Sequence, residues 1–144
     1  MTGQPQHQLL LLERVAMGSV GVTARAVAES APELTLLQWR VLVVLAEAPD
    51  GTTVSELASR IGSRLPATSR LIGRMRRRGL VEMRKNHHDA RVTTVLPAAA
   101  GRELWERVVD SRRSQLVAVL AAAALIPSDQ PGLERLARAM ETFL

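Results

Sequence analysis

The chain has 144 residues, and none of them is cysteine. The absence of thiols excludes disulfides, thiolate-ligated zinc, cysteine nucleophiles and thiol-based redox sensing. Tyrosine is also absent, and there is a single phenylalanine. Because proteins that bind single-stranded nucleic acids stack the bases on aromatic rings, this composition disfavours that class of binding surface.

Long apolar runs are missing too. The longest spans Leu116–Ile126, 11 residues, whereas a transmembrane helix needs about 20. The first apolar stretch, Leu9–Leu12, is interrupted at once by Glu13 and Arg14, so it does not resemble a signal peptide. We therefore expect a cytoplasmic protein with no membrane partner.

Catalytic patterns are equally scarce. The sequence contains no Ser/His/acid spacing, carboxylate pair, phosphate-binding loop or cluster of metal ligands. His87 and His88 are adjacent, but neighbouring side chains on a strand or turn point apart, and no carboxylate cluster accompanies them. We expect no enzyme, no cofactor and no metal site, and we assign His88 to a phosphate contact instead.

What the chain does have is positive charge concentrated in one segment. Ten of its nineteen basic residues lie between Arg60 and Arg91, where the only acidic residues are Glu82 and Asp89. This window carries a formal charge of +8, and the rest of the chain carries −3. The net charge of +5 is therefore one basic patch on a slightly acidic body, which indicates a polyanionic partner.

The hydrophobic spacing predicts a mostly helical fold with a small β component. Helices are expected at about 9–29, 36–48, 54–61, 66–78, 98–125 and 132–144, after a frayed segment at 1–8. Thr35–Gln38 and Thr53–Glu56 are typical of capping boxes, and Gly62 suits a tight turn between the third and fourth helices. Strands at about 80–85 and 92–96 flank a turn at 86–89. A helix-turn-helix followed by a hairpin is a winged helix.

The fourth predicted helix carries most of the basic window. Its positions 70, 74, 77 and 78 are all arginine and lie on one face. Leu71, Ile72 and Met75 lie on the other side, where they would pack on Leu57 and Ile61. Such a stripe could be a solvated surface. However, it has no acidic partner and lies on the second helix of a helix-turn-helix, which favours DNA binding.

Several short motifs follow one another in a fixed order: Leu34-Thr35 with Gln38, Thr53-Val54-Ser55-Glu56-Leu57-Ala58, Thr68-Ser69-Arg70-Leu71-Ile72, Arg74-Met75, Gly79-Leu80-Val81, Asp89-Ala90-Arg91, Val95 and Gly101. Their order and spacing resemble the MarR family of bacterial transcription regulators. The resemblance covers about residues 10–144. Two positions depart from the family pattern: Pro97-Ala98 replaces Leu-Thr before the last long helix, and Gly73 replaces an acidic residue. We expect Pro97 to set the start of that helix and Gly73 to loosen the preceding one slightly.

The helix-turn-helix places the start of its second helix in the major groove. Arginine there can bind guanine, threonine a base edge or phosphate, and alanine a thymine methyl group. By resemblance, Arg91 reaches the minor groove from the wing, braced by Asp89, although an ordinary exposed ion pair would have the same spacing. The predicted DNA-binding residues are Ser63, Arg64, Pro66, Ala67, Thr68, Arg70, Arg74, Arg77, Lys85, His88, Asp89 and Arg91.

The two ends of the chain carry more apolar residues than one small winged helix can bury, which predicts either an intramolecular bundle or a dimer interface. The resemblance implies a two-fold homodimer. The single domain, 1–144, would then have dimerisation helices at about 9–33 and 98–144 and a DNA-binding region at about 34–97. The resemblance also implies a cavity for a small aromatic or phenolic ligand, lined by Trp39 and Trp105, although tryptophans at helical positions are more often plain core.

We therefore expect a sequence-specific regulator that binds double-stranded DNA, acting as a homodimeric repressor on an inverted-repeat operator and released by a small ligand. The alternative is an architectural DNA-binding protein of low sequence specificity without a ligand. A membrane-surface role is disfavoured, because the basic helix lacks an apolar face rich in Trp and Phe.

Overall fold

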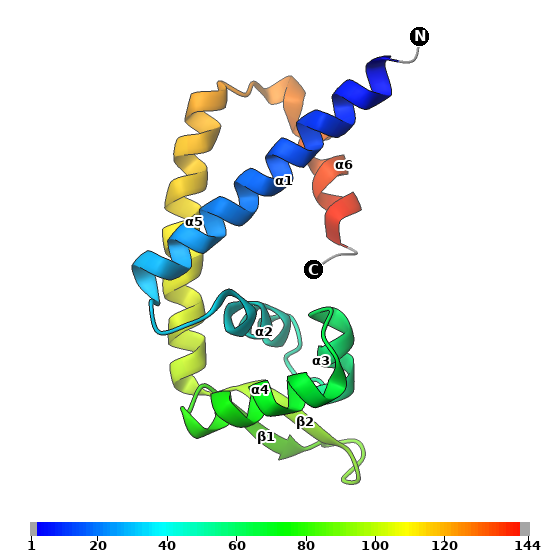
Figure 1. Ribbon diagram of the computed structural model, residues 1–144, viewed down its shortest axis with the longest axis vertical. Coiled ribbons are helices and arrows are strands. Elements are labelled where there is room, and N and C mark those ends of the chain that lie inside the picture. Colours follow the sequence, from blue (N-terminus) through cyan, green and yellow to red (C-terminus); the bar gives the residue numbers. More distant parts are fainter. Residues whose placement is uncertain (1–2, 142–144) are drawn as a thin grey trace.

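The computed structural model describes residues 3–141 (Figure 1). It is a mostly helical winged helix with two long terminal helices, as the sequence predicts. The elements in order are α1 (Gly3–Ser30), α2 (Leu36–Ala46), α3 (Val54–Arg60), α4 (Leu65–Arg77), β1 (Val81–Lys85), β2 (Thr93–Pro97), α5 (Ala99–Ala123), the short 3-10 helix η1 (Pro127–Asp129) and α6 (Gln130–Met140). The helices and strands follow the predicted bounds closely, except that α1 is already helical at Gly3, so the expectation of a frayed segment at 1–8 is wrong for residues 3–8. Residues 1 and 2 lie outside the described part.

The centre of the winged helix is α2, whose start is held by the predicted capping box. The Thr35 N–H donates to Gln38 Oε1 at 2.9 Å, and the Gln38 N–H donates to Thr35 Oγ1 at 3.2 Å. These bonds satisfy backbone and side-chain groups that the helix start would otherwise leave free. Helix α2 buries residues on nearly every side, including Trp39 and Leu42, so the other elements assemble around it.

Helices α3 and α4 form the predicted helix-turn-helix. The Thr53 hydroxyl caps α3 by accepting from the Glu56 N–H at 3.2 Å, and Gly62 adopts the left-handed φ of 65° expected for the turn. The apolar face of α4 contributes Leu71, Ile72 and Met75 to the same core cluster as Leu57 and Ile61. The predicted inward face of α4 is therefore confirmed.

The wing is an antiparallel pair in which Val81 lies opposite Pro97 and Lys85 lies opposite Thr93. The segment before α3 adds one further bridge, because Thr52 exchanges backbone hydrogen bonds with Val95 at 3.1 and 2.8 Å. Gly51 makes this approach possible: its φ is +79°, and a Cβ there would lie 2.9 Å from the Val95 carbonyl oxygen. The wing is thus anchored to the helix-turn-helix by main-chain contacts.

Helices α1 and α5 form a stem that projects from the winged helix (Figure 1). Only the lower end of α1 is buried, at Ala26 and Val27. Among the described residues, all but three of the exposed large apolar side chains belong to the stem, the α5–α6 connection or α6: Leu9, Leu10, Leu11, Leu12, Val15, Met17, Val20, Leu116, Val117, Val119, Leu120, Leu125, Ile126, Leu133 and Met140. The interpretation of these residues as an intramolecular bundle is therefore wrong, because the chain does not cover them.

Helix α5 ends at Ala123, and Ala124 takes a left-handed φ of 49° that turns the chain toward α6. Among the described helices, none alone is long and apolar enough to cross a membrane. Helix α5 and the segment Pro127–Met140, bent by 112°, meet the criterion of length and composition only as a pair.

Gly101 should be indispensable for joining the stem to the wing. A Cβ at this buried position would lie 2.1 Å from the Leu80 carbonyl oxygen and 3.2 Å from Leu42 Cδ2. We expect Gly101→Ala to lower the free energy of unfolding by at least about 2 kcal/mol in urea titrations. The control is Gly73→Ala in α4, where the nearest atom is 3.7 Å away, and which should raise stability by about 0.5–1 kcal/mol. Equal effects of the two substitutions would contradict the packing argument.

Thr52 should be a site where removing a hydroxyl stabilises the fold. Its side chain is buried, and Oγ1 has no hydrogen-bond partner among the described residues. Since an unpaired buried hydroxyl costs about 1–3 kcal/mol, we expect the nearly isosteric Thr52→Val to raise the free energy of unfolding by about 1 kcal/mol. Thr68→Val is the control, because the Thr68 hydroxyl is buried but donates to the Arg64 carbonyl at 3.2 Å. A loss of stability in both variants would show that Thr52 has an unrecognised partner.

Candidate nucleic-acid interface

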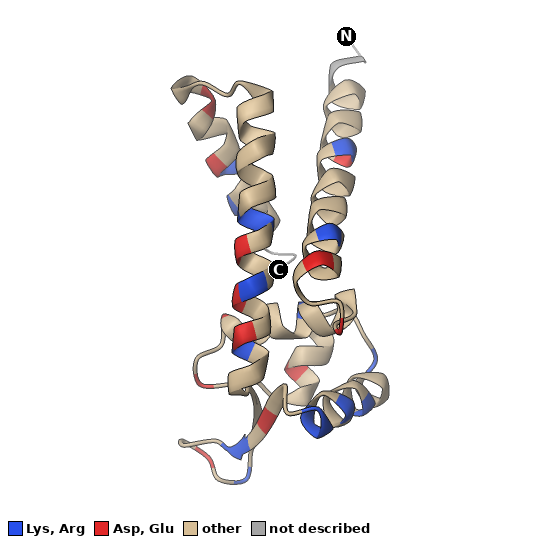
Figure 2. Cartoon of the chain, turned by 90° about the vertical axis from the view of Figure 1, so that its left-hand side faces the viewer, with Lys and Arg blue, Asp and Glu red and all other residues tan. Residues whose placement is uncertain are grey.

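Helix α4 and the wing lie together at the end of the molecule opposite the free ends of the stem (Figure 1). Figure 2 shows basic residues along α4 and further ones on the wing, whereas the stem carries both signs of charge. The basic window of the sequence therefore becomes one end of the folded chain.

The exposed side of α4 carries uncompensated positive charge. Arg70, Arg74 and Arg77 are exposed, and none of them has an ion pair or hydrogen bond with any residue in the described range 3–141. Arg76 shares this environment, although the sequence reasoning did not single it out. Since α4 has no acidic residue, its arginines remain available for phosphates or base edges.

The first turn of α4 presents a smaller set of groups. Arg64 is the N-cap residue but makes no side-chain capping bond, and it is exposed together with Pro66. Ser63 and Ala67 are half-buried. Leu65 is exposed by 50% and was missed by the sequence reasoning, although an apolar side chain beside Pro66 is suited to contact a thymine methyl group.

The predicted DNA contact of Thr68 is wrong for this fold. Its side chain is completely buried, and its hydroxyl donates to the Arg64 carbonyl. Thr68 lies four residues before Ile72 and seven before Met75, which places it on the inward face of the helix. The side chain packs α4 against the core, and its hydroxyl donates back to the preceding turn.

The tip of the wing is organised around two acceptor side chains. Asn86 Oδ1 accepts from the backbone of His88 at 2.8 Å and of Asp89 at 3.3 Å. Asp89 Oδ1 accepts from Arg91 Nε at 3.1 Å and from its backbone N–H at 2.9 Å. The side-chain bond to Arg91, followed by the backbone bond, lowers the pKa of Asp89. The predicted brace is present, and it leaves the Arg91 side chain 92% exposed.

Lys85 and His88 are also exposed on the wing. Lys85 Nζ donates to Thr93 Oγ1 on the opposite strand at 3.3 Å. This hydrogen bond holds the ammonium group against the neighbouring strand. Within the described residues, no group of three or more His, Asp or Glu side chains could hold a metal ion. The arrangement of the wing suits contacts with phosphate rather than coordination.

Arg78 departs from the predicted stripe. It follows the last residue of α4, and its Nη2 donates to the Glu33 carbonyl at 2.8 Å while Nη1 donates to Gln38 Oε1 at 3.4 Å. Its guanidinium group is therefore directed at the α1–α2 junction and not at the exposed face shared by Arg70 and Arg74. The interpretation of Arg78 as part of that face is wrong, because position 78 lies seven residues after buried Leu71 and three after buried Met75, at the edge of the inward face.

Other cations of the basic window are paired with acidic residues at the surface of the fold. Arg60 pairs with Glu47, and Arg84 pairs with Glu82 at 2.6 Å. These pairs do not belong to the candidate interface. The interface therefore consists of α4 and the wing tip, and it is smaller than the charge count of the sequence indicates.

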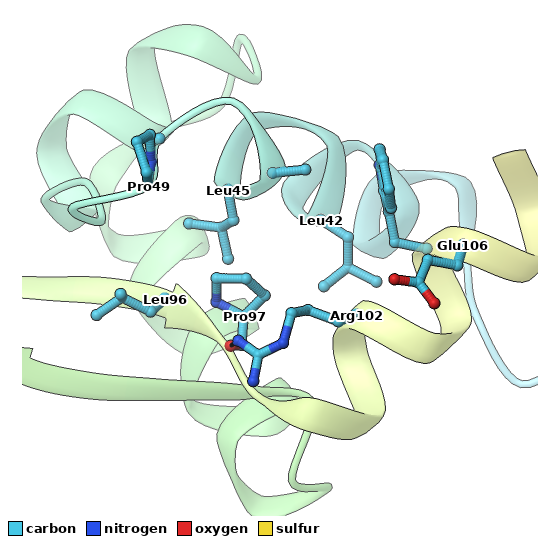
Figure 3. Close-up of a pocket in the computed structure, with 10 residues that line it drawn as sticks. Leu42, Leu45, Pro49, Leu96, Pro97, Arg102 and Glu106 are labelled. Carbon is cyan, nitrogen blue, oxygen red and sulfur yellow. Dashed lines mark hydrogen bonds between the residues drawn. The ribbon is translucent and has the colours of Figure 1, made fainter.

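A cavity of about 280 Å³ lies where β2 returns to the stem (Figure 3). It is lined by Leu42, Leu45, Ala46, Ala48, Pro49, Leu96, Pro97, Arg102, Trp105 and Glu106. Arg102 Nη1 donates to the Pro97 carbonyl at 2.6 Å, which ties the start of α5 to the end of the wing. Trp105 thus lines a cavity, as the sequence reasoning expected, but most of the other lining residues were not anticipated.

Trp39 does not line this cavity. It is 3% exposed and belongs to the core cluster. The guanidinium carbon of Arg112 lies 5.7 Å from the centre of its ring, and burial lowers the pKa of Arg112. Trp39 packs α2 against α5 as a core residue, the alternative that the sequence left open, and its contact with a ligand stays a prediction.

The comparisons with known proteins agree with this architecture. Residues 33–92 match the sequence model of the MarR family. A MarR family protein from Bacillus stearothermophilus has a similar structure, with 24% identity, a TM-score of 0.81 and coverage of 99% of this chain and 96% of that one. None of the proteins with curated functions matches the sequence.

Two further structures are similar at lower identity. CouR from Rhodococcus jostii RHA1, solved with p-coumaroyl-CoA bound, is 22% identical, with a TM-score of 0.69 and coverage of 92% and 90%. A mutant of MepR from S. aureus, solved bound to an oligodeoxyribonucleotide, is 16% identical, with a TM-score of 0.61 and coverage of 95% and 98%. The winged helix, residues 33–92, is thus of the MarR type by sequence, and the whole chain shares the fold of solved MarR family proteins.

Proposed function

We propose that the protein is a homodimeric repressor that binds an inverted repeat in double-stranded DNA and is released by a small ligand. The observation that carries the proposal is the row of exposed arginines without acidic partners on the second helix of the helix-turn-helix. Like charges at this spacing repel one another, and DNA phosphates would relieve that repulsion. The structure of MepR with an oligodeoxyribonucleotide supports the same use of this fold.

The positions along α4 suggest a division of contacts. Arg70 lies in the first half of the helix, close to the end that enters the groove, and we assign it to base edges. Arg74 and Arg77 lie further along and would contact phosphates, together with Ser63, Arg64 and Lys85. Arg91, braced by Asp89, would enter the minor groove, with His88 near a phosphate.

The exposed apolar surface of the stem supports assembly with a second copy of the chain. Residues of α1, the upper half of α5 and α6 form it, and patches of this extent mark interfaces in soluble proteins. Residues 9–33 and 98–144 would therefore form the dimer, and 34–97 the DNA-binding region. A two-fold dimer presents two α4 helices, which requires an inverted repeat with half-sites about one helical turn apart.

The cavity beside Trp105 is the candidate site for the ligand. Its apolar wall would hold an aromatic or phenolic group, and Arg102 at its edge offers a cation to a polar end. Because Arg102 also holds the Pro97 carbonyl, a ligand that engages it would disturb the joint between wing and stem. The p-coumaroyl-CoA in CouR is an acyl thioester with a phenolic group, which supports this ligand class.

The alternative function is an architectural protein that binds DNA with little sequence preference. Both functions use the same arginines, so a loss of positive charge would weaken DNA binding in either case and does not distinguish the two functions. Selection of binding sites from randomised duplexes by the full chain does: enrichment of an inverted repeat supports the repressor, and the absence of any enriched sequence supports the architectural protein. Release of the selected duplex by small aromatic acids then tests the ligand.

Arg70 and Arg77 should have separable effects on DNA binding. If about eight phosphates are contacted per dimer, the logarithm of the affinity should fall against the logarithm of salt with a slope of about −7. Arg77→Ala should weaken selected and random DNA alike and reduce that slope. Arg70→Ala should cost about 1–3 kcal/mol on the selected sequence only. Both effects can be measured by fluorescence anisotropy over a salt series.

The control for charge is Arg113→Ala on the stem, where Arg113 is exposed and 3.9 Å from Asp110. This variant loses the same formal charge far from α4 and should bind as the parent chain does. Equal losses for Arg70→Ala on selected and random DNA would show that Arg70 contacts phosphate and not bases.

Dimerisation should depend on the exposed leucines of the stem. Leu120 is 50% exposed on α5, so Leu120→Glu should leave the fold intact while placing a charge in the interface. We expect sedimentation at micromolar concentration to show a dimer for the parent chain and a monomer for this variant. Ala100→Glu, at an exposed position in the first turn of the same helix, is the control and should stay dimeric. A dimeric Leu120→Glu would place the interface elsewhere.

A further inference from the structure

Three consecutive arginines, Arg76, Arg77 and Arg78, close α4, but the structure gives the third a different environment from the other two. Arg76 and Arg77 are exposed without partners among the described residues, whereas Arg78 donates to Glu33 and Gln38. The same side chain in the same run therefore has two different environments, and the position around the helix decides between them, since Arg78 lies seven residues after buried Leu71, beside the inward face.

The acceptors of Arg78 belong to the junction between α1 and α2. The Glu33 carbonyl lies in the connecting segment, and Gln38 Oε1 is the atom that also accepts from the Thr35 N–H in the capping box. Gln38 is buried, so its position is fixed by the core. Arg78 thus ties the end of α4 to a part of the fold that cannot easily move.

The connection continues into the stem. The carboxylate of the same Glu33 accepts from Arg107 Nη2 of α5 at 3.2 Å. Further along the stem, Gln115 Nε2 of α5 donates to Glu29 Oε2 of α1 at 3.2 Å. Glu33 therefore links the end of α4 to α5, and a separate contact joins α5 to α1, the helices that we assign to the dimer.

We propose that Arg78 is a positioning residue: it fixes α4 relative to the stem and thereby sets the half-site spacing that the dimer accepts. This inference rests on the proposed function for its DNA readout, but the tether itself is a property of one chain. Arginine suits the role because its planar group reaches two acceptors on different segments at once, which a single ammonium group does not.

The spacing of an operator is a sensitive readout of this role. Moving two half-sites apart by two base pairs also rotates one of them by about 70° around the DNA axis. A dimer with rigidly held α4 helices cannot follow that rotation, whereas one with loosened helices can. The loss of Arg78 should therefore broaden the range of accepted spacings, which a uniform loss of charge or of folded protein does not.

The experiment uses duplexes that carry the selected inverted repeat at its native spacing or with one or two base pairs added or removed. For the parent chain and Arg76→Ala, we expect affinity to fall at least about 30-fold when the spacing changes by two base pairs. For Arg78→Ala, the native duplex should bind about 10-fold more weakly, and the spacings should differ from one another by no more than about 3-fold. Arg78→Lys keeps the charge and should show the same broad profile.

A second measurement tests the tether without DNA. Because the chain has no cysteine, Ser69→Cys on α4 and Ser114→Cys on α5 introduce two unique sites for spin labels at exposed positions. Dilution with unlabelled chain isolates the distance within one chain. The distance distribution should be narrow in the otherwise unaltered chain and with Arg76→Ala, and broad with Arg78→Ala.

An Arg78→Ala chain with a narrow distance distribution and a parental spacing profile would overturn the proposal. If the parent chain selects no sequence, the repressor function fails, but the label distances still decide whether Arg78 positions α4. Melting curves of all variants separate loosening from unfolding, since partial unfolding lowers affinity equally at every spacing.

Discussion

The contact between Leu80 and the start of α5 is the constraint on which the rest of the molecule depends. The Leu80 N–H donates to the Met75 carbonyl of α4, and the Leu80 carbonyl accepts from the Ala98 N–H, both at 3.0 Å. Gly101 lies directly against that carbonyl, in a space that no Cβ could share. The backbone of Leu80 therefore joins α4, the wing and the stem. The direction of the arginine face relative to the stem therefore rests first on main-chain geometry, and the side-chain bonds of Arg78 add a second connection.

The distribution of charge follows from the same architecture. Cations near the centre of the winged helix are paired, as Arg60 is with Glu47, whereas those on the outer face of α4 are not. The repulsion within that face is a few tenths of a kcal/mol per pair, and burial of a side chain such as Ile72 or Met75 contributes about 1.5–3 kcal/mol. The apolar face of α4 can therefore hold an arginine face in place without local counterions.

Much of this fold could be predicted from the sequence, because its signals are local. The capping residues Thr35 and Thr53, and the glycine at 62, act within one turn of the chain. The structure confirms the full capping box at Thr35 and the turn at Gly62, and at Thr53 it confirms the hydroxyl cap on the Glu56 N–H. The burial of Thr68 could also have been predicted, since its spacing to Ile72 and Met75 places it on the inward face. The direction of Arg78 could have been predicted in part, since it lies seven residues after Leu71. Its acceptors Glu33 and Gln38 could not, because they are 45 and 40 residues away in the sequence. The cavity at Arg102 and Trp105 could not be predicted either, since it exists only after α2, β2 and α5 have packed together.

The two halves of the chain differ in what they need in order to be stable. The winged helix buries its own core around α2, whereas the upper stem and α6 leave side chains such as Val117 and Ile126 exposed. A second copy that covers that surface would stabilise the whole folded chain by mass action, because Leu104 and Val108 of the stem share one core cluster with the winged helix. The distance between two α4 helices is defined only in a dimer, although each α4 is positioned by contacts within its own chain. Leu80 on one side and Arg78 on the other connect α4 rigidly to the stem. Through this connection, a dimer interface formed by the stem would control how α4 contacts DNA at the opposite end of the molecule.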